Sequence, residues 1–134
     1  MDRKEKALEF HSKGYNCAQS VALTFCDEFG ADKETSFRLA EALGFGMGCM
    51  HACGALTGMG LVVGMKMSDG NLEAPKTKKQ CYKMMSQLTE KFEEKVGSTI
   101  CREIKGVETG NVLRSCNGCI TDAVELIEEY LIEK

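Results

Sequence analysis

The chain has 134 residues, a net charge of −3 and eight cysteines. This length fits one domain, 1–134, with a core of its own, and about 6% cysteine lies below the roughly 8–10% that marks a disulfide scaffold. Basic and acidic side chains are mixed along both halves, so we expect no nucleic-acid partner. The composition excludes a small disulfide-stapled scaffold and leaves the number of thiols to be explained.

The first third of the sequence predicts three amphipathic helices separated by glycines. Residues 2–12 form the first, which ends at Gly14. Asn16 caps a second helix that runs to about residue 29, and Asp32 caps a third that runs to about residue 43. No convincing alternating strand pattern occurs here or later in the chain, so we expect an all-α fold.

A glycine-rich stretch without charge, residues 42–65, occupies the middle of the chain. We expect a turn and then a helix over 49–66, which is too interrupted by glycine for a membrane span and is better read as a buried core helix. Its two GxxxG motifs, at 54–58 and 60–64, give the helix two smooth faces. The helix should therefore lie at the centre of the bundle, or at the interface of a homodimer.

The second half of the sequence predicts one long helix, one short helix and a last amphipathic helix. Pro75 suits the first turn of a helix that continues to about residue 96. Ser98 and Thr99 can cap the short helix, and the last helix covers about 116–133. The whole chain thus predicts a single-domain helical bundle of about five main helices around the central glycine-rich helix.

The Cys116-x-x-Cys119 motif is the clearest chemical signal. Two thiols three residues apart at a helix start share one face, and the helix dipole stabilises a thiolate there. The spacing suits a dithiol–disulfide couple with Cys116 attacking and Cys119 resolving, and equally half of a four-cysteine metal site. No βαβ pattern surrounds the motif, so a thioredoxin fold is not supported.

Cys49 and Cys53 form a second pair, four residues apart in the expected helix 49–66. At this spacing both sulfurs project to the same side of a helix. His51, between them, would face away in a regular helix, so it could join them as a ligand only if this turn is irregular.

The other cysteines divide by position. Cys17 and Cys101 are expected in the first turn of a helix, as Cys49 and Cys116 are, and that position lowers the pKa of a thiol. Cys26 lies about half a turn around the helix from Cys17 and is read as structural, while Cys81 belongs to an apolar seam.

Four short segments, spread in order along most of the chain, carry a resemblance: Gly14-Tyr15-Asn16-Cys17-Ala18-Gln19, Cys53-Gly54-Ala55-Leu56-Thr57-Gly58, Cys101-Arg102-Glu103 and Cys116. In combination they resemble the redox-active protein family named for its C_GCAxxG_C_C signature. The chain departs from the signature at Met50, where alanine is expected after Gly48-Cys49, and at Cys53-Gly54, where cysteine and glycine are exchanged. Either Cys49 or Cys53 is therefore the central cysteine of the signature.

The resemblance implies a small helical protein with a redox or metal-cluster function, in which Cys17, one of Cys49 or Cys53, Cys101 and Cys116 are the signature thiols. It implies no particular substrate. Cys119 is added on its spacing from Cys116 alone.

Our leading hypothesis is a cytoplasmic redox-active thiol protein, since the N-terminus carries no apolar signal segment. It would use either thiol–disulfide exchange or a metal cluster, for which iron–sulfur is one candidate, with an unidentified redox partner protein or small-molecule electron donor. The alternatives are a non-enzymatic module with a structural zinc–cysteine site and a plain helical interaction protein.

These hypotheses name three groups of candidate residues. The candidates for thiol catalysis are Cys116, Cys119 and Cys101. The candidate metal ligands are Cys49, Cys53, Cys101, Cys116 and Cys119. The candidates for contact with a cofactor are Cys17, Gly54 and Gly58.

Overall fold

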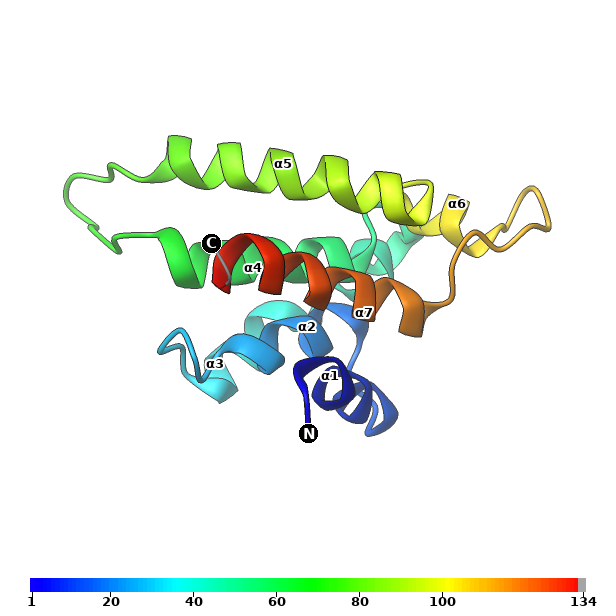
Figure 1. The fold of residues 1–134 in the computed structure, drawn as a ribbon, viewed down its shortest axis with the longest axis horizontal. Helices are drawn as coiled ribbons and strands as arrows, with labels where there is room; N and C mark the ends of the chain where they lie inside the picture. The colour runs from blue at the N-terminus through cyan, green and yellow to red at the C-terminus, as the bar shows by residue number, and fades with distance from the viewer. Residues whose placement is uncertain (133–134) are drawn as a thin grey trace.

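The computed structural model describes residues 1–132 and is mostly helical, with no strand in this range (Figure 1). The all-α prediction is confirmed, but the expected number of about five main helices is too low, because seven α-helices form in the described residues. They are α1 (Arg3–Ser12), α2 (Cys17–Phe25), α3 (Lys33–Glu41), α4 (Gly54–Met67), α5 (Lys78–Val96), α6 (Cys101–Lys105) and α7 (Cys116–Ile127).

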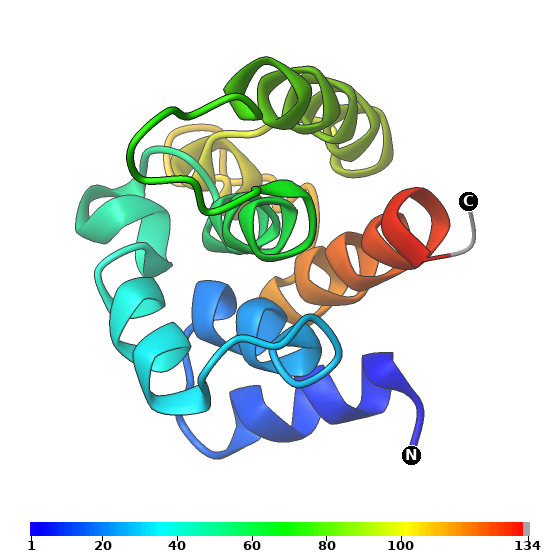
Figure 2. The same ribbon diagram turned by 90° about the vertical axis from the view of Figure 1, so that its left-hand side faces the viewer.

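The glycine-rich helix α4 lies at the centre of the bundle, as the sequence predicted. It packs most extensively on α2 and also contacts α5 and α7, while α1 and α3 pack on α2 from outside (Figures 1 and 2). The main core contains fully buried side chains from α2, α4, α5 and α7, among them Phe25, Met59, Phe92 and Ile120. This arrangement places the N-terminal ends of several helices at one end of the molecule.

The first GxxxG motif explains the close packing of α2 on α4. A Cβ atom added at Gly58 would lie 2.9 Å from the Ala18 carbonyl oxygen, and one at Gly54 would lie 3.1 Å from the Cys17 Cβ. The second motif has no such role, because Gly64 has nothing within 4 Å of that position. The glycines at 54 and 58 thus let the backbone of α2 approach α4 closely, which offsets their poor helix propensity.

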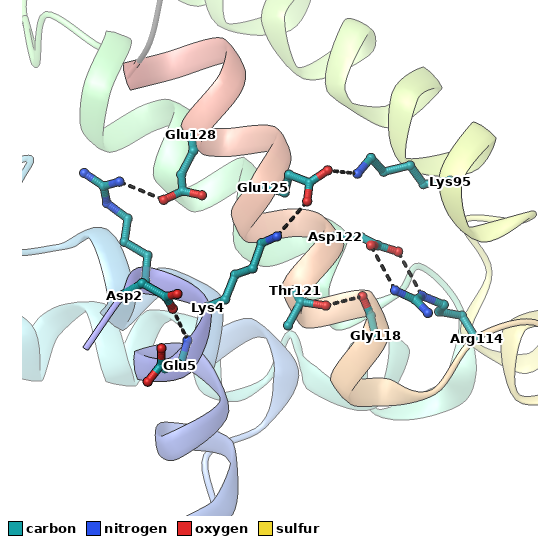
Figure 3. Close-up of polar contacts among 11 residues, drawn as sticks. Asp2, Lys4, Glu5, Lys95, Arg114, Gly118, Thr121, Asp122, Glu125 and Glu128 are labelled. Atoms are coloured by element: carbon teal, nitrogen blue, oxygen red, sulfur yellow. Dashed lines mark hydrogen bonds and ion pairs between the residues drawn. The ribbon is translucent and has the colours of Figure 1, made fainter.

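Ion pairs hold α7 between α1 and α5. The Glu125 carboxylate accepts hydrogen bonds from Lys4 of α1, at 2.7 Å, and from Lys95 of α5 (Figure 3). These two ammonium groups lower the pKa of Glu125 to about 2. Both partners are substantially exposed to solvent, so each pair adds orientation more than stability.

Local capping signals place several helix starts correctly. Asn16 forms a capping box with Gln19 at the start of α2, and the Asp32 side chain accepts the Thr35 backbone N–H at the start of α3. The predicted end of the second helix near residue 29 is wrong, because the helix ends at Phe25 and a turn follows.

Three expected boundaries in the second half also differ. Helix α5 begins at Lys78 rather than Pro75, and the N-cap of α6 is Ile100 rather than Ser98 or Thr99. The Ser98 hydroxyl instead accepts the Ile100 backbone N–H and donates to the Glu103 carboxylate. Helix α7 gives way to a π-helical turn over Glu128–Ile132, and the expected end at residue 133 lies outside the described residues.

The largest difference concerns the expected helix over 49–66, because α4 starts only at Gly54. Residues 51–53 pair with residues 99–101: the Cys53 N–H donates to the Thr99 carbonyl at 2.8 Å, and the Cys101 N–H donates to the His51 carbonyl at 2.6 Å. The backbone at 51–53 therefore cannot be helical. The predicted same-face geometry of Cys49 and Cys53 is wrong for this reason.

The segment before this pairing is left-handed. Phe45, Gly46, Met47 and Gly48 are four consecutive residues with positive φ, at 53°, 59°, 60° and 77°. Left-handed backbone costs a residue with a side chain about 1–2 kcal/mol. The turn brings Gly46 so close to α6 that an added Cβ would lie 2.9 Å from the Cys101 Cβ. The left-handed segment thus covers one side of the region where the starts of α2, α4, α6 and α7 come together.

Candidate thiol site

The starts of α2, α4, α6 and α7 meet around one cavity of about 190 Å³. Five thiols line it, one or two from each of these helix starts: Cys17, Cys53, Cys101, Cys116 and Cys119. Cys17, Cys101 and Cys116 are the first residues of their helices, as the sequence predicted, and Cys53 is the N-cap of α4. The fold thus brings together cysteines that lie as far as about 100 residues apart in the chain.

Each cysteine of the CxxC motif is coupled in its pKa to a cysteine of a different element. Cys17, on α2, as the protonated partner, lowers the pKa of Cys116 through a thiol–thiolate hydrogen bond. Cys119, one turn further along α7, lowers the pKa of Cys53 at the start of α4 in the same way. We call Cys17 and Cys116 the outer couple, because both are partly exposed, and Cys53 and Cys119 the inner couple, because both are buried.

Cys116 is the thiolate of the outer couple. The hydrogen bond from Cys17 and the Lys105 ammonium, whose Nζ lies 3.6 Å from the Cys116 Sγ, lower the pKa of Cys116 to about 5 against the opposing effect of burial. The same hydrogen bond, together with burial, raises the pKa of Cys17. At neutral pH the couple therefore consists of one thiolate and one thiol that shares its proton with it.

Cys53 is the cysteine with the lower pKa in the inner couple, as Cys116 is in the outer couple. The hydrogen bond from Cys119, with support from the backbone N–H groups of Ala55 and Leu56, lowers the pKa of Cys53 to about 7. These N–H groups belong to the first turn of α4, where no intrahelical acceptor is available to them. Donation to Cys53 and burial together raise the pKa of Cys119.

Cys101 completes the cavity wall. It is 7% exposed, and burial raises the pKa of its thiol, although the charge of Lys105 opposes this shift. Cys101 lies with both couples in the cavity, but as a protonated thiol it is the less nucleophilic candidate for catalysis.

Two other sequence candidates lie elsewhere. Cys49 is exposed on the left-handed segment, where its Sγ contacts the Gly46 carbonyl at 3.6 Å, and His51 is exposed next to it. Gly54 lines the cavity, whereas Gly58 lies one turn away against α2. Of the five expected metal ligands, four thus line the cavity and Cys49 does not. Within residues 1–132, no three His, Cys, Asp or Glu side chains are disposed to hold a metal ion.

The two cysteines read as packing residues also lie outside the cavity. Cys26 is fully buried in a small cluster between α2 and α3, which agrees with a structural role. Cys81 is half-buried on α5 against the main core.

Sequence reasoning missed the charged residues of the cavity, of which Lys105 matters most. Lys105 follows Cys101 by one helical turn, a spacing that could have indicated a cation on the same face. Its Nζ also lies 5.8 Å from the centre of the Phe45 ring, which lines the cavity from the left-handed segment. The Arg114 guanidinium lines the cavity too, but Asp122 of α7 binds it in a bidentate ion pair at 3.0 and 3.1 Å (Figure 3). Lys105 is thus the main cation that acts on Cys116, and His11, which also lines the cavity, makes a smaller contribution of the same sign.

Fold and site together define a small all-helical protein with a pocket of thiols at converging helix starts. A family model described as "Putative redox-active protein (C_GCAxxG_C_C)" matches residues 15–130, and the chain belongs to this family. Cys53, and not Cys49, joins Cys17, Cys101 and Cys116 in the cavity, so the structure places Cys53 with the other signature thiols. No curated protein and no solved structure matches the chain.

In the part of the chain that the structure describes, no helix combines the length and the apolar character needed to cross a bilayer.

Proposed function

We propose that this protein is a thiol–disulfide oxidoreductase or electron carrier in which Cys116 attacks and Cys17 resolves. The observation that carries the proposal is the hydrogen-bonded outer couple beside Lys105, at a cavity that other thiols line. A thiolate, rather than a thiol, attacks disulfides, and Cys116 is ionised at neutral pH. This supports Cys17, rather than Cys119, as the partner of Cys116.

The proposed reaction has two steps that balance. The Cys116 thiolate attacks one sulfur of a substrate disulfide, which forms a mixed disulfide and releases the first substrate thiolate. Cys17 then attacks the Cys116 sulfur and releases the second substrate thiolate, which takes up the proton of Cys17. The first substrate thiolate takes its proton from water, so the substrate disulfide is reduced to two thiols, and the outer couple is oxidised to one disulfide.

Return to the dithiol requires a reductant, either a redox partner protein or a small thiol. A reducing compartment such as the cytoplasm would supply one and would keep both couples as thiols between turnovers.

The test is to trap the mixed disulfide on the full chain with bis(2-hydroxyethyl) disulfide. In Cys17→Ser the mixed disulfide at Cys116 should accumulate, because its resolving thiol is missing, and intact mass spectrometry would detect it. Cys81→Ser, outside the cavity, is the matched control and should react as the unchanged protein does. If Cys116→Ser reacts at the pocket as fast as the unchanged protein, Cys116 is not the nucleophile.

The alternative functions in this pocket are an iron–sulfur centre and a structural zinc site, for which Cys53, Cys101, Cys116 and Cys119 would have to move together, because no three side chains of the described residues are disposed to hold a metal ion. Elemental analysis of anaerobically purified protein separates them from thiol exchange. Stoichiometric iron or zinc, lost when these cysteines are replaced, would favour the metal centre.

A further inference from the structure

We propose that the inner couple, Cys53 and Cys119, is a second redox site that exchanges its disulfide with the outer couple, so that the pocket stores two disulfides instead of one. This inference rests on the proposed thiol–disulfide function and extends it from two electrons to four. It assigns a redox role to a pair of cysteines that the outer reaction does not use.

Burial keeps the inner couple from reacting directly with a substrate. Cys53 is 6% exposed and Cys119 is 2% exposed, whereas both residues of the outer couple are partly exposed. The cavity, at about 190 Å³, is smaller than the roughly 300–1,000 Å³ of a typical ligand pocket, which is too little for a peptide or a nucleotide. Oxidation of the inner couple must therefore proceed through the outer couple.

The two couples are neighbours on both sides. Cys116 and Cys119 lie one turn apart on α7. On the opposite side, Cys17 packs against Gly54, the residue that follows Cys53, where only glycine leaves room for the Cys17 Cβ. The charge of Cys53 also raises the pKa of Cys17, as expected for sulfurs that share one cavity. The four sulfurs of the two couples thus face one cavity, as exchange between them requires.

The exchange takes two steps. The Cys53 thiolate attacks the Cys17 sulfur of the outer disulfide, forms a Cys17–Cys53 disulfide and releases the Cys116 thiolate. Cys119 then attacks the Cys53 sulfur and releases Cys17, to which the proton of Cys119 passes. Two electrons move from the inner to the outer couple, no external reactant is consumed, and the outer couple is again a dithiol that can react with a second substrate disulfide.

The direction of exchange follows from how well each reduced couple is stabilised. Lys105 contacts the Cys116 thiolate, so the reduced outer couple is stabilised by a cation that the inner couple does not contact. A couple whose reduced form is stabilised in this way has the more oxidising disulfide, and a thiolate with a low pKa is also the better leaving group. The disulfide should therefore move from the outer to the inner couple.

The experiment uses the reduced full-length protein in a Cys49→Ser background, which removes the exposed thiol outside the cavity. One equivalent of dithiodipyridine is added anaerobically, samples are quenched with acid over time, and disulfides are assigned by tandem mass spectrometry. We expect the Cys17–Cys116 disulfide first, then its replacement by Cys53–Cys119 with Cys17 and Cys116 free. A second equivalent should then oxidise the outer couple again.

Two variants test the proposed path of disulfide exchange. Cys119→Ser should stop the exchange at the Cys17–Cys53 disulfide, while Cys81→Ser should behave as the background protein does. A Cys17–Cys116 disulfide that persists while Cys53 and Cys119 stay reduced would overturn the exchange and leave the proposed function standing. Failure to form any Cys17–Cys116 disulfide would overturn both. The time course of the background protein decides between these outcomes even if Cys119→Ser does not fold.

Discussion

The charge of Lys105 should control the reactivity of Cys116, and Lys105→Met tests this directly. Methionine retains the length and the apolar stem of lysine, so the packing around Phe45 and the cavity wall is kept while the cation is removed. The largest cause of the low Cys116 pKa, the hydrogen bond from Cys17, stays in place. The substitution thus isolates the contribution of one charge at 3.6 Å.

The expected rise in the Cys116 pKa is about 1–2 units. An opposite charge at this separation shifts a pKa by about 1–3 units, and the lower part of that range applies because Lys105 is partly exposed. From a starting value of about 5, this is a loss of about 1.4–2.7 kcal/mol in the relative stability of the thiolate. At pH 6 the thiolate fraction should fall from about nine-tenths to between about a half and a tenth.

The assay is the pH dependence of the alkylation rate of Cys116 by iodoacetamide, read by peptide mass spectrometry. The rate at pH 6 should fall about two- to tenfold, whereas at pH 9 it should be equal or slightly higher, because a thiolate of higher pKa is more nucleophilic. Lys79→Met, on the exposed side of α5, is the matched control and should leave the profile unchanged. An unchanged midpoint in Lys105→Met would refute the proposed role of this cation.

Three further predictions concern stability. In urea denaturation, Gly58→Ala should destabilise the protein by about 1–3 kcal/mol, because the new Cβ meets the α2 backbone. Gly64→Ala should stabilise it by about 0.5–1 kcal/mol, because the new Cβ meets nothing. Equal effects of the two substitutions would contradict the packing role of Gly58. Oxidation of the outer couple should stabilise the protein against urea by about 2–4 kcal/mol, since it cross-links residues about 100 apart, and no gain would indicate that the disulfide strains the fold. Glu125→Gln should cost less than about 1 kcal/mol at neutral pH. The pKa of Glu125 in the folded protein, about 2, lies below its ordinary value of 4.5, so the stability difference between Glu125→Gln and the unchanged protein should be complete above pH 4.5 and should vanish as the pH falls through 2. A stability difference that persists below pH 2 would show that it does not arise from the ion pairs.

The helices whose starts depend on a local cap could be predicted from the sequence. Asn16 and Asp32 each accept a backbone N–H three residues ahead, and such a signal lies entirely within the segment that it starts. The start of α4 could not be predicted in this way. Its position depends on the pairing of residues 51–53 with residues 99–101, which are distant in sequence, and the apolar, glycine-rich residues before Gly54 fit a helix equally well on local grounds.

The members of the thiol site were more predictable than their pairing. Helix-start positions selected Cys17, Cys49, Cys101 and Cys116, and the cavity contains all of these except Cys49, which lies outside any α-helix start. The rule that cysteines three residues apart share a helix face suggested Cys116 with Cys119, but such a rule compares only residues of one helix. The partners Cys17 and Cys53 come from α2 and from the start of α4, so the pairing depends on how three helices pack.

The contacts of Cys116 with Cys17 and of Cys119 with Cys53 depend on the spacing of the CxxC motif. Three residues of α-helix advance about 4.5 Å along the axis and stop about 60° short of a full turn. That angle directs Cys116 toward α2 and Cys119 toward the start of α4. One residue more or fewer between them would rotate one sulfur by about 100° away from its partner. The number of residues between Cys116 and Cys119 thus sets the angle between the two reactive sulfurs. An insertion or deletion between them would break one couple and leave the helix intact.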